Sequence, residues 1–180
     1  KKKLYNRSYM ISNSGKIVCK YDKIHMFDVN ISKSESYQES KIFTKGKKIV
    51  TAKLPWGRIG MSICYDLRFP TLYRKLCSNG ASMISIPAAF TRPTGKSHWR
   101  TLIKARAIEN LSFVFAPAQC GINSSTRKTY GHSMIVSPWG KIIAEMRGNP
   151  GIILAKIDLS EVSKCRKMIP SYKGTTIEKK

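Results

Sequence analysis

The stretch that decides the fold is residues 60–70, GMSICYDLRFP, in which an apolar segment leads into a helical pattern. Residues 58–63 predict a short buried strand, and Pro70 suits the first turn of a helix. Cys64 therefore stands at a strand-to-helix junction, which presents its side chain at the carboxyl edge of a sheet. The dipole and free N–H groups of a helix N-terminus favour a thiolate and can hold an oxyanion, so Cys64 is a candidate nucleophile. The alternative is a buried structural cysteine, because cysteine is one of the most buried residue types.

Strand-like and helix-like segments alternate on both sides of this junction, which favours an α/β fold. Hairpins are predicted to pair residues 9–11 with 16–21 and residues 132–136 with 141–145. Between them lie predicted helices at residues 70–80 and at residues 97–110, with Ser97 as N-cap, and predicted strands at residues 82–86 and 113–116. We also expect a final strand at residues 151–157 and a long functional loop in the serine-rich residues 30–40. The sequence has no internal repeat or clear linker, so residues 1–180 are expected to form one domain.

The strongest signal in the composition is a formal net charge of +23. Such a charge can indicate binding to nucleic acid through neutralisation of phosphates. However, the basic residues are dispersed along the chain, and no zinc-finger, helix-turn-helix or RNP-type pattern occurs. We therefore expect a lysine-rich solvated surface and no nucleic-acid partner, with a basic nucleic-acid-binding module as the rival interpretation.

The number and spacing of the cysteines and histidines limit which disulfides and metal sites the chain can form. The five cysteines are odd in number, widely spaced and without a C-x-x-C pair, which favours a reducing cytoplasm over a disulfide framework. The three histidines, His25, His98 and His132, are far apart, so no zinc site is predicted. No apolar run approaches the roughly 18 residues that a membrane span needs, so no membrane partner is expected.

Two charged residues upstream of Cys64 are further candidates. Lys23 lies in residues 21–28, YDKIHMFD, where apolar neighbours flank it. A lysine drawn into an apolar pocket is costly unless it is used or paired. Glu39 follows as one of only 10 acidic residues. For both, an ordinary surface position is the alternative.

Several stretches together resemble the nitrilase superfamily of carbon–nitrogen hydrolases. Residues 22–29, DKIHMFDV, resemble its lysine motif, and residues 60–70 resemble its cysteine motif. The later stretches TGKSHW, ARAIEN, AQCG, YGHS and PWG follow in the order of that family. The similarity runs from about Tyr5 to Tyr172 and is greatest to the branch of deaminated-glutathione amidases and ω-amidases. It implies a nitrilase-type α-β-β-α sandwich, with two sheets face to face and helices outside.

The resemblance also implies a mechanism. Cys64 would attack the carbonyl of a small carboxylate-bearing amide and form a thioester acyl-enzyme, which water then hydrolyses. Lys23 and the backbone N–H of Tyr65 would stabilise the oxyanion, and Glu39 would support Lys23. Arg68 is a candidate for binding a substrate carboxylate, the alternative being a structural ion pair with Asp66 or with an acid elsewhere. No metal or organic cofactor is implied.

Other expectations concern the extent of the chain and its surroundings. The family's general-base glutamate is expected upstream of the lysine motif, so the chain is interpreted as the C-terminal two-thirds of the domain, with impaired activity. A cytoplasmic homodimer is expected. Alternatives are an ω-amidase acting on 2-oxoglutaramate and a catalytically inactive structural relative. His98, His132 and Cys120 are interpreted as structural residues, with Cys120 in the core. Arg100 stands where many relatives have a glutamate, which puts a local salt bridge in doubt.

Overall fold

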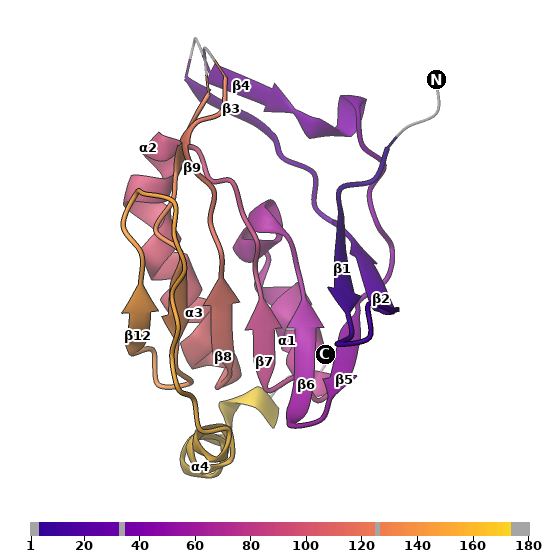
Figure 1. Cartoon of the computed structure of the whole chain (residues 1–180), viewed down its shortest axis with the longest axis vertical. Coiled ribbons are helices and arrows are strands. Elements are labelled where there is room, and N and C mark those ends of the chain that lie inside the picture. Colours follow the sequence, from indigo (N-terminus) through magenta and orange to yellow (C-terminus); the bar gives the residue numbers. More distant parts are fainter. Residues whose placement is uncertain (1–3, 33–34, 125–126, 174–180) are drawn as a thin grey trace, which may run out of the picture.

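The computed structural model describes residues 4–32, 35–124 and 127–173, which are arranged around one mixed sheet (Figure 1). The six strands of this sheet lie in the order β12-β11-β8-β7-β6-β5. Strands β6, β7 and β8 are parallel, and their neighbours on both sides are antiparallel. The bounds are β5 Thr51–Leu54, β6 Gly57–Met61, β7 Met83–Ser85, β8 Phe113–Ala116, β11 Met134–Val136 and β12 Ile142–Glu145.

One face of the sheet is covered by two helices, α1 (Pro70–Ser78) and α3 (Arg100–Asn110). Successive strand residues point to opposite faces, so alternate positions of β7 and β8 enter different cores. Ile84 and Val114 belong to the cluster that packs against these helices. Met83 and Phe113 belong to a cluster on the other face. Both faces of β7 and β8 are therefore largely buried, in agreement with their mainly apolar sequences.

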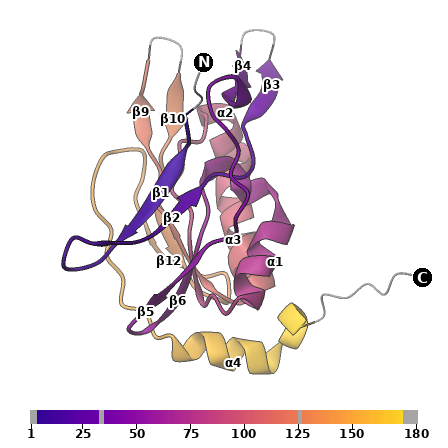
Figure 2. The same cartoon turned by 90° about the vertical axis from the view of Figure 1, so that its right-hand side faces the viewer.

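The second face is covered by the hairpin of β1 (Arg7–Ile11) and β2 (Ile17–Asp22), which lies on the opposite side of the sheet from the helices (Figure 2). Met10 and Cys19 of this hairpin pack against the cluster around Met83 and Phe113. Helix α4 (Ser160–Met168) contributes Val162 to the same cluster, and the short helix η4 (Pro170–Lys173) follows it. No helix among the described residues combines the length and apolar character of a membrane span.

Two further hairpins stand at the end of the molecule toward which the parallel strands point (Figure 1). The first pairs β3 (Asp28–Ser32) with β4 (Glu35–Gln38) and continues into the 3₁₀ turn η1 (Glu39–Lys41). The second pairs β9 (Cys120–Ile122) with β10 (Lys128–Tyr130). The 3₁₀ turn η2 (Cys64–Arg68) follows β6 at this same edge of the sheet. The carboxyl ends of the parallel strands are thus surrounded by irregular segments and hairpins, the usual position of a site in an α/β protein.

Most of the predicted elements are confirmed. The hairpin over residues 9–21, the strands around residues 58–63, 82–86 and 113–116, and the hairpin over residues 132–145 are present with shifted ends. The helix predicted from Pro70 is α1, with proline in its first turn. The sequence did not predict β5, because its threonine and lysine obscure the short apolar pattern, nor the hairpin of β9 and β10.

Three predictions of local structure are wrong. Residues 30–40 are mainly the β3–β4 hairpin and η1, because polar residues suit a hairpin with solvent-facing positions as well as a loop. The second helical segment begins at Arg92, and α2 (Arg92–Thr94) and a π turn (Gly95–Trp99) lead into α3, so Ser97 is not an N-cap. Gly95 does not break this segment. It is required by close packing, since an added Cβ would lie 2.3 Å from Cβ of Tyr130.

The third error concerns residues 151–157, which form no strand in the structure. Their burial alternates as in a strand, but no hydrogen-bonded partner strand is found for them among the described residues. Ile152 and Leu154 are 84% and 88% exposed. An extended segment becomes a strand only where a neighbour pairs with its N–H and C=O groups, which sequence periodicity cannot report.

Candidate active site

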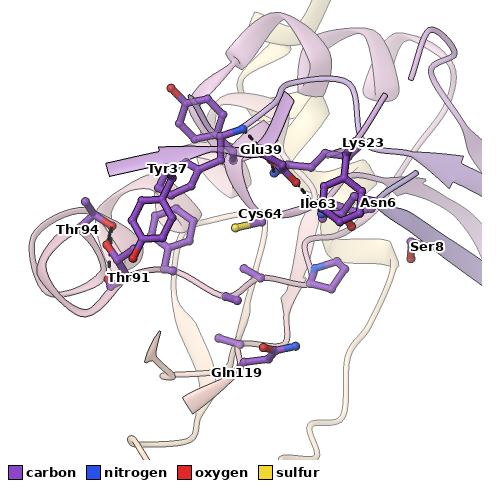
Figure 3. Close-up of a pocket in the computed structure, with 18 of the residues that line it drawn as sticks. Asn6, Ser8, Lys23, Tyr37, Glu39, Ile63, Cys64, Thr91, Thr94 and Gln119 are labelled. Atoms are coloured by element: carbon purple, nitrogen blue, oxygen red, sulfur yellow. Dashed lines mark hydrogen bonds and ion pairs between the residues drawn. The ribbon is translucent and has the colours of Figure 1, made fainter. Parts of the chain in front are cut away.

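A pocket of about 890 Å³ opens at the edge of the sheet where η2 begins. Its walls come from segments that are far apart in the sequence, including both hairpins, the end of β2 and the turns after β7 and β8. Figure 3 shows Cys64 near its centre, between two groups of side chains. Lys23, Glu39 and Asn6 lie on one side, and Tyr37, Thr91 and Thr94 lie on the other.

Cys64 is the first residue of η2 and has a left-handed backbone conformation, with φ of 50°. Non-glycine residues rarely adopt such a conformation, and strained backbone of this kind clusters at functional sites. The backbone N–H of Cys64 donates to the carbonyl of Pro87 at 2.9 Å, which ties the turn to the segment that follows β7. The sharp turn resembles a nucleophile elbow, although a 3₁₀ turn separates Cys64 from helix α1.

The carboxylate of Asp66 fixes this turn. It is fully buried and accepts from the backbone N–H of Ile63 at 2.9 Å and from the hydroxyl of Tyr21 at 2.7 Å. Its other oxygen faces the backbone N–H of His25 at 3.0 Å and the ring Nδ1 of His25 at 2.7 Å. Asp66 therefore joins the Cys64 turn to the end of β2, the segment that carries Lys23.

Lys23 is 2% exposed, and its Nζ lies 2.5 Å from Oε2 of Glu39. Glu39 also accepts from the backbone N–H of Phe27 at 2.6 Å and from Nδ2 of Asn6 at 2.9 Å. Burial acts to raise the pKa of Glu39, but the hydrogen bonds from Lys23 and Asn6 and the charge of Lys23 lower it overall. Glu39 is thus a carboxylate held by three donors, and it orients the buried ammonium.

The charge state of Cys64 follows from three competing effects. Burial raises the pKa of the Cys64 thiol, while the charge of Lys23 and a hydrogen bond from the backbone of Ala89 lower it. Burial dominates, so the pKa lies above its ordinary value. Any favourable effect of the adjacent helix N-terminus on the thiolate is therefore outweighed by burial in this resting structure.

Arg68 lines the pocket at the other end of η2. Its guanidinium lies 5.9 Å from the ring centroid of Tyr65 and 5.5 Å from that of Phe90, both within the range of a cation–π contact. An Nη of Arg68 lies 3.3 Å from Nδ1 of His98. The alternative ion pair between Arg68 and Asp66 is absent, since the oxygens of Asp66 face other donors.

Comparison with known proteins identifies the family. A sequence model of the carbon-nitrogen hydrolase family matches residues 1–167. This chain belongs to the carbon-nitrogen hydrolase family. The deaminated glutathione amidase of Dictyostelium discoideum is 46% identical over 171 residues, and that of a Synechocystis strain is 44% identical. The match covers 94% of this chain but only 59% and 63% of those two proteins, less than two thirds of their length.

Solved structures agree with the family assignment. The C. elegans NitFhit protein superposes with a TM-score of 0.89 at 40% identity, covering 94% of this chain and 42% of that one. Saccharomyces cerevisiae Nit3, a member of branch 10 of the nitrilase superfamily, gives a TM-score of 0.84 at 34% identity, covering 94% and 59%. The nitrilase-type α/β fold predicted from the motifs is therefore confirmed.

Several residues of this carbon-nitrogen hydrolase lie outside the pocket. His132 faces Glu145, with Nδ1 3.2 Å from Oε1, and stacks on Tyr130. Arg100 contacts both oxygens of Glu145, at 2.8 and 2.7 Å. A local salt bridge, which the arginine at this position had put in doubt, is therefore present. Cys120 is only partly buried and belongs to no core cluster, which corrects its interpretation as a core residue.

The sequence did not predict four residues of the hydrolase pocket. Asn6 holds Glu39, the backbone of Ala89 contacts Cys64, and Tyr37 and Arg127 come from the β3–β4 and β9–β10 hairpins. None of these residues has a distinctive sequence context, and the two hairpins were not predicted. Within the described residues, no group of three or more His, Cys, Asp or Glu side chains is placed to hold a metal ion.

Proposed function

We propose that this chain carries the acyl-transfer site of an amidase that hydrolyses a small carboxylate-bearing amide resembling deaminated glutathione. The observation that carries the proposal is a partly exposed Cys64 in a strained turn, beside a buried lysine that a glutamate orients. The names of the relatives that match most of the chain support the substrate class. Because the match covers less than two thirds of those relatives, their activity is a proposal for this chain.

The proposed reaction has two stages. The sulfur of Cys64 attacks the amide carbonyl, and the thiol proton is transferred to the amide nitrogen. The tetrahedral intermediate then collapses with cleavage of the C–N bond and departure of the neutral amine. A water molecule then attacks the thioester, which releases the carboxylic acid and restores the thiol. Lys23 Nζ and the backbone N–H of Tyr65 are assigned to the oxyanion in both stages, and each well-placed donor of this kind contributes about 3 kcal/mol.

Glu39 is assigned a positioning role in this mechanism. Among the described lining residues it is the one carboxylate, and its oxygens already accept from three donors. A carboxylate with a lowered pKa that is bound in this way is a poor proton acceptor. The resemblance assigns deprotonation of the thiol to a different glutamate, upstream of the lysine motif.

Arg68 is proposed to bind a substrate carboxylate. It lines the pocket, and the ring contacts with Tyr65 and Phe90 hold its guanidinium without neutralising it. A guanidinium can clamp a carboxylate with two parallel hydrogen bonds. A pocket of about 890 Å³ lies near the upper end of the range for organic ligands of tens of atoms. This size favours a tripeptide-like amide over the smaller 2-oxoglutaramate.

The assembly and surroundings are also part of the proposal. A homodimer through the helical face is favoured by Ile108 on α3 and Trp139 in the β11–β12 turn, which are 47% and 55% exposed. The backbone at Gly140, the residue after Trp139, packs against Ile108. The five free cysteines suit a reducing compartment such as the cytoplasm.

The test is direct detection of the acyl-enzyme. The chain is incubated with deaminated glutathione or 2-oxoglutaramate, quenched in acid, and mapped by peptide mass spectrometry, with Cys64→Ala as the control. We expect a 2-oxoglutaryl thioester on Cys64, formed faster from deaminated glutathione. Absence of any adduct on Cys64 under conditions in which iodoacetamide modifies it would contradict the proposed function.

A further inference from the structure

Arg127 is a second arginine of the pocket that the mechanism above does not use. It lies just before β10 and lines the pocket together with Cys64 and Arg68. One Nη donates to the carbonyl of Ala89 at 3.1 Å, and the guanidinium lies 5.6 Å from the ring centroid of Tyr37. Its Nε is buried and has no hydrogen-bond partner within the described part of the chain. The ligand-facing part of Arg127 is therefore sought in the Nη groups rather than in Nε, because Nε has almost no accessible surface.

The charges that line the pocket are unevenly paired. Arg7 is paired with Asp22, and Lys23 is paired with Glu39. Arg68 and Arg127 take part in none of the salt bridges found among the described residues. Two guanidinium groups therefore face one pocket without a counter-charge, an arrangement that favours an anionic ligand with more than one negative group.

Arg127 is also close to the reacting sulfur through a shared residue. The carbonyl of Ala89 accepts from Arg127, and the backbone of the same residue hydrogen-bonds with Cys64. Burial raises the pKa of the Cys64 thiol, and the charge of Arg127 is among the effects that lower it. A group bound by Arg127 would thus belong to the same small molecule whose carbonyl stands over Cys64.

We infer that Arg127 is a specificity-determining residue that binds a second substrate carboxylate, in addition to the one assigned to Arg68. The inference rests on the proposed function and narrows it to amides with two carboxylates. Deaminated glutathione meets this requirement, with one carboxylate on its 2-oxo acid end and one on its glycine end, whereas 2-oxoglutaramate has only one. Ala89 and the ring of Tyr37 hold the guanidinium of Arg127 in place, and its remaining N–H groups are assigned to the carboxylate.

The competing explanation is that Arg127 only braces the backbone at Ala89. A brace predicts equal loss of affinity for all ligands when Arg127 is changed, whereas a carboxylate-binding residue predicts loss for one charged group alone. Calorimetric binding in a Cys64→Ala background separates the two explanations without turnover. The ligands are deaminated glutathione, its analogue with the glycine carboxylate amidated, and its analogue with the 2-oxo acid carboxylate amidated.

We expect amidation of either carboxylate to weaken binding about 10- to 100-fold when both arginines are present. In Arg127→Gln, amidation of one of the two ligand carboxylates no longer weakens binding. Amidation of the other carboxylate still does. Arg68→Gln shows the converse pattern. Arg127→Lys keeps the positive charge, so amidation of the same carboxylate should weaken binding by an intermediate factor. This variant preserves the test if Arg127→Gln folds poorly. Lys128→Gln makes the same charge change at the adjacent exposed residue. In this control, amidation of either carboxylate should still weaken binding.

Equal weakening of all three ligands in Arg127→Gln, unchanged binding in that variant, or absence of measurable binding to the parent chain would each overturn the inference. Failure of the proposed function has a different signature. In that case the parent chain with Cys64 intact forms no thioester, while the Arg127-dependent penalty persists in the calorimetric series.

Discussion

Nζ of Lys23 lies 2.5 Å from Oε2 of Glu39, so a buried ammonium and a carboxylate 16 residues apart form one unit beside Cys64. The pair supplies a fixed positive charge next to the thiol without leaving an unneutralised ion in the protein interior. Its geometry depends on two hairpins, because Lys23 directly follows β2 and Glu39 directly follows β4. Removing either partner therefore has consequences for both stability and chemistry.

Glu39→Gln is expected to destabilise the fold by about 3–5 kcal/mol, because it leaves the Lys23 ammonium buried without a carboxylate. Lys23→Met combined with Glu39→Gln should recover much of this loss, since no charge then remains. Urea unfolding of the single and double variants measures the coupling. Additive losses in the double variant would show that the pair is not an energetic unit.

The lowered pKa of Glu39 makes stability depend on pH in the acid range. Its pKa in the folded protein lies below the ordinary value of 4.5, so the folded state binds the proton less well than the unfolded chain. The stabilisation is therefore complete above about pH 4.5 and is lost as the pH falls through the folded-state pKa. The stability difference between the parent chain and Glu39→Gln should shrink over this window. A difference that stays constant down to pH 2 would contradict the assignment.

Alkylation of Cys64 should require a higher pH than alkylation of free cysteine, because burial raises the pKa of the thiol and only the thiolate reacts. Lys23→Met should move the pH dependence of labelling further upward, because it removes a charge that lowers this pKa. The measurement is the iodoacetamide rate at the Cys64 peptide from pH 6 to 10. Arg92→Gln, an exposed cation outside the pocket lining, is the matched control. Faster labelling in Lys23→Met would refute the argument.

Asp66→Asn should weaken the connection between the Cys64 turn and the end of β2, because Asp66 accepts from Ile63, Tyr21 and His25. We expect a loss of about 2–4 kcal/mol and a larger fall in thioester formation than in substrate binding. Thermal unfolding and single-turnover acylation check the two effects. Asp158→Asn, an exposed carboxylate before α4, serves as control. Normal acylation in Asp66→Asn would mean that the turn holds Cys64 without this carboxylate.

The central elements of the fold were predictable because their signals are local. Pro70 and the apolar positions behind it define α1, and the short, mainly apolar segments of β7 and β8 define buried strands. The polar hairpin of β3 and β4 carries no such signal, because its serines are compatible with a loop. The irregular path of residues 151–157 could not be predicted either, because strand formation depends on a partner elsewhere in the chain.

The features of the candidate site also fall into two groups, those that the sequence indicates and those that only the structure reveals. The sequence by itself determined the family and nominated Cys64, Lys23, Glu39 and Arg68, since their motifs are contiguous and ordered along the chain. Only the tertiary structure decided that Lys23 is buried against Glu39 and that Asp66 braces the turn rather than pairing with Arg68. It alone brought Arg127 into the pocket. Burial, pairing and pKa depend on distances between segments separated along the chain, and those distances are set by packing, which no local pattern encodes.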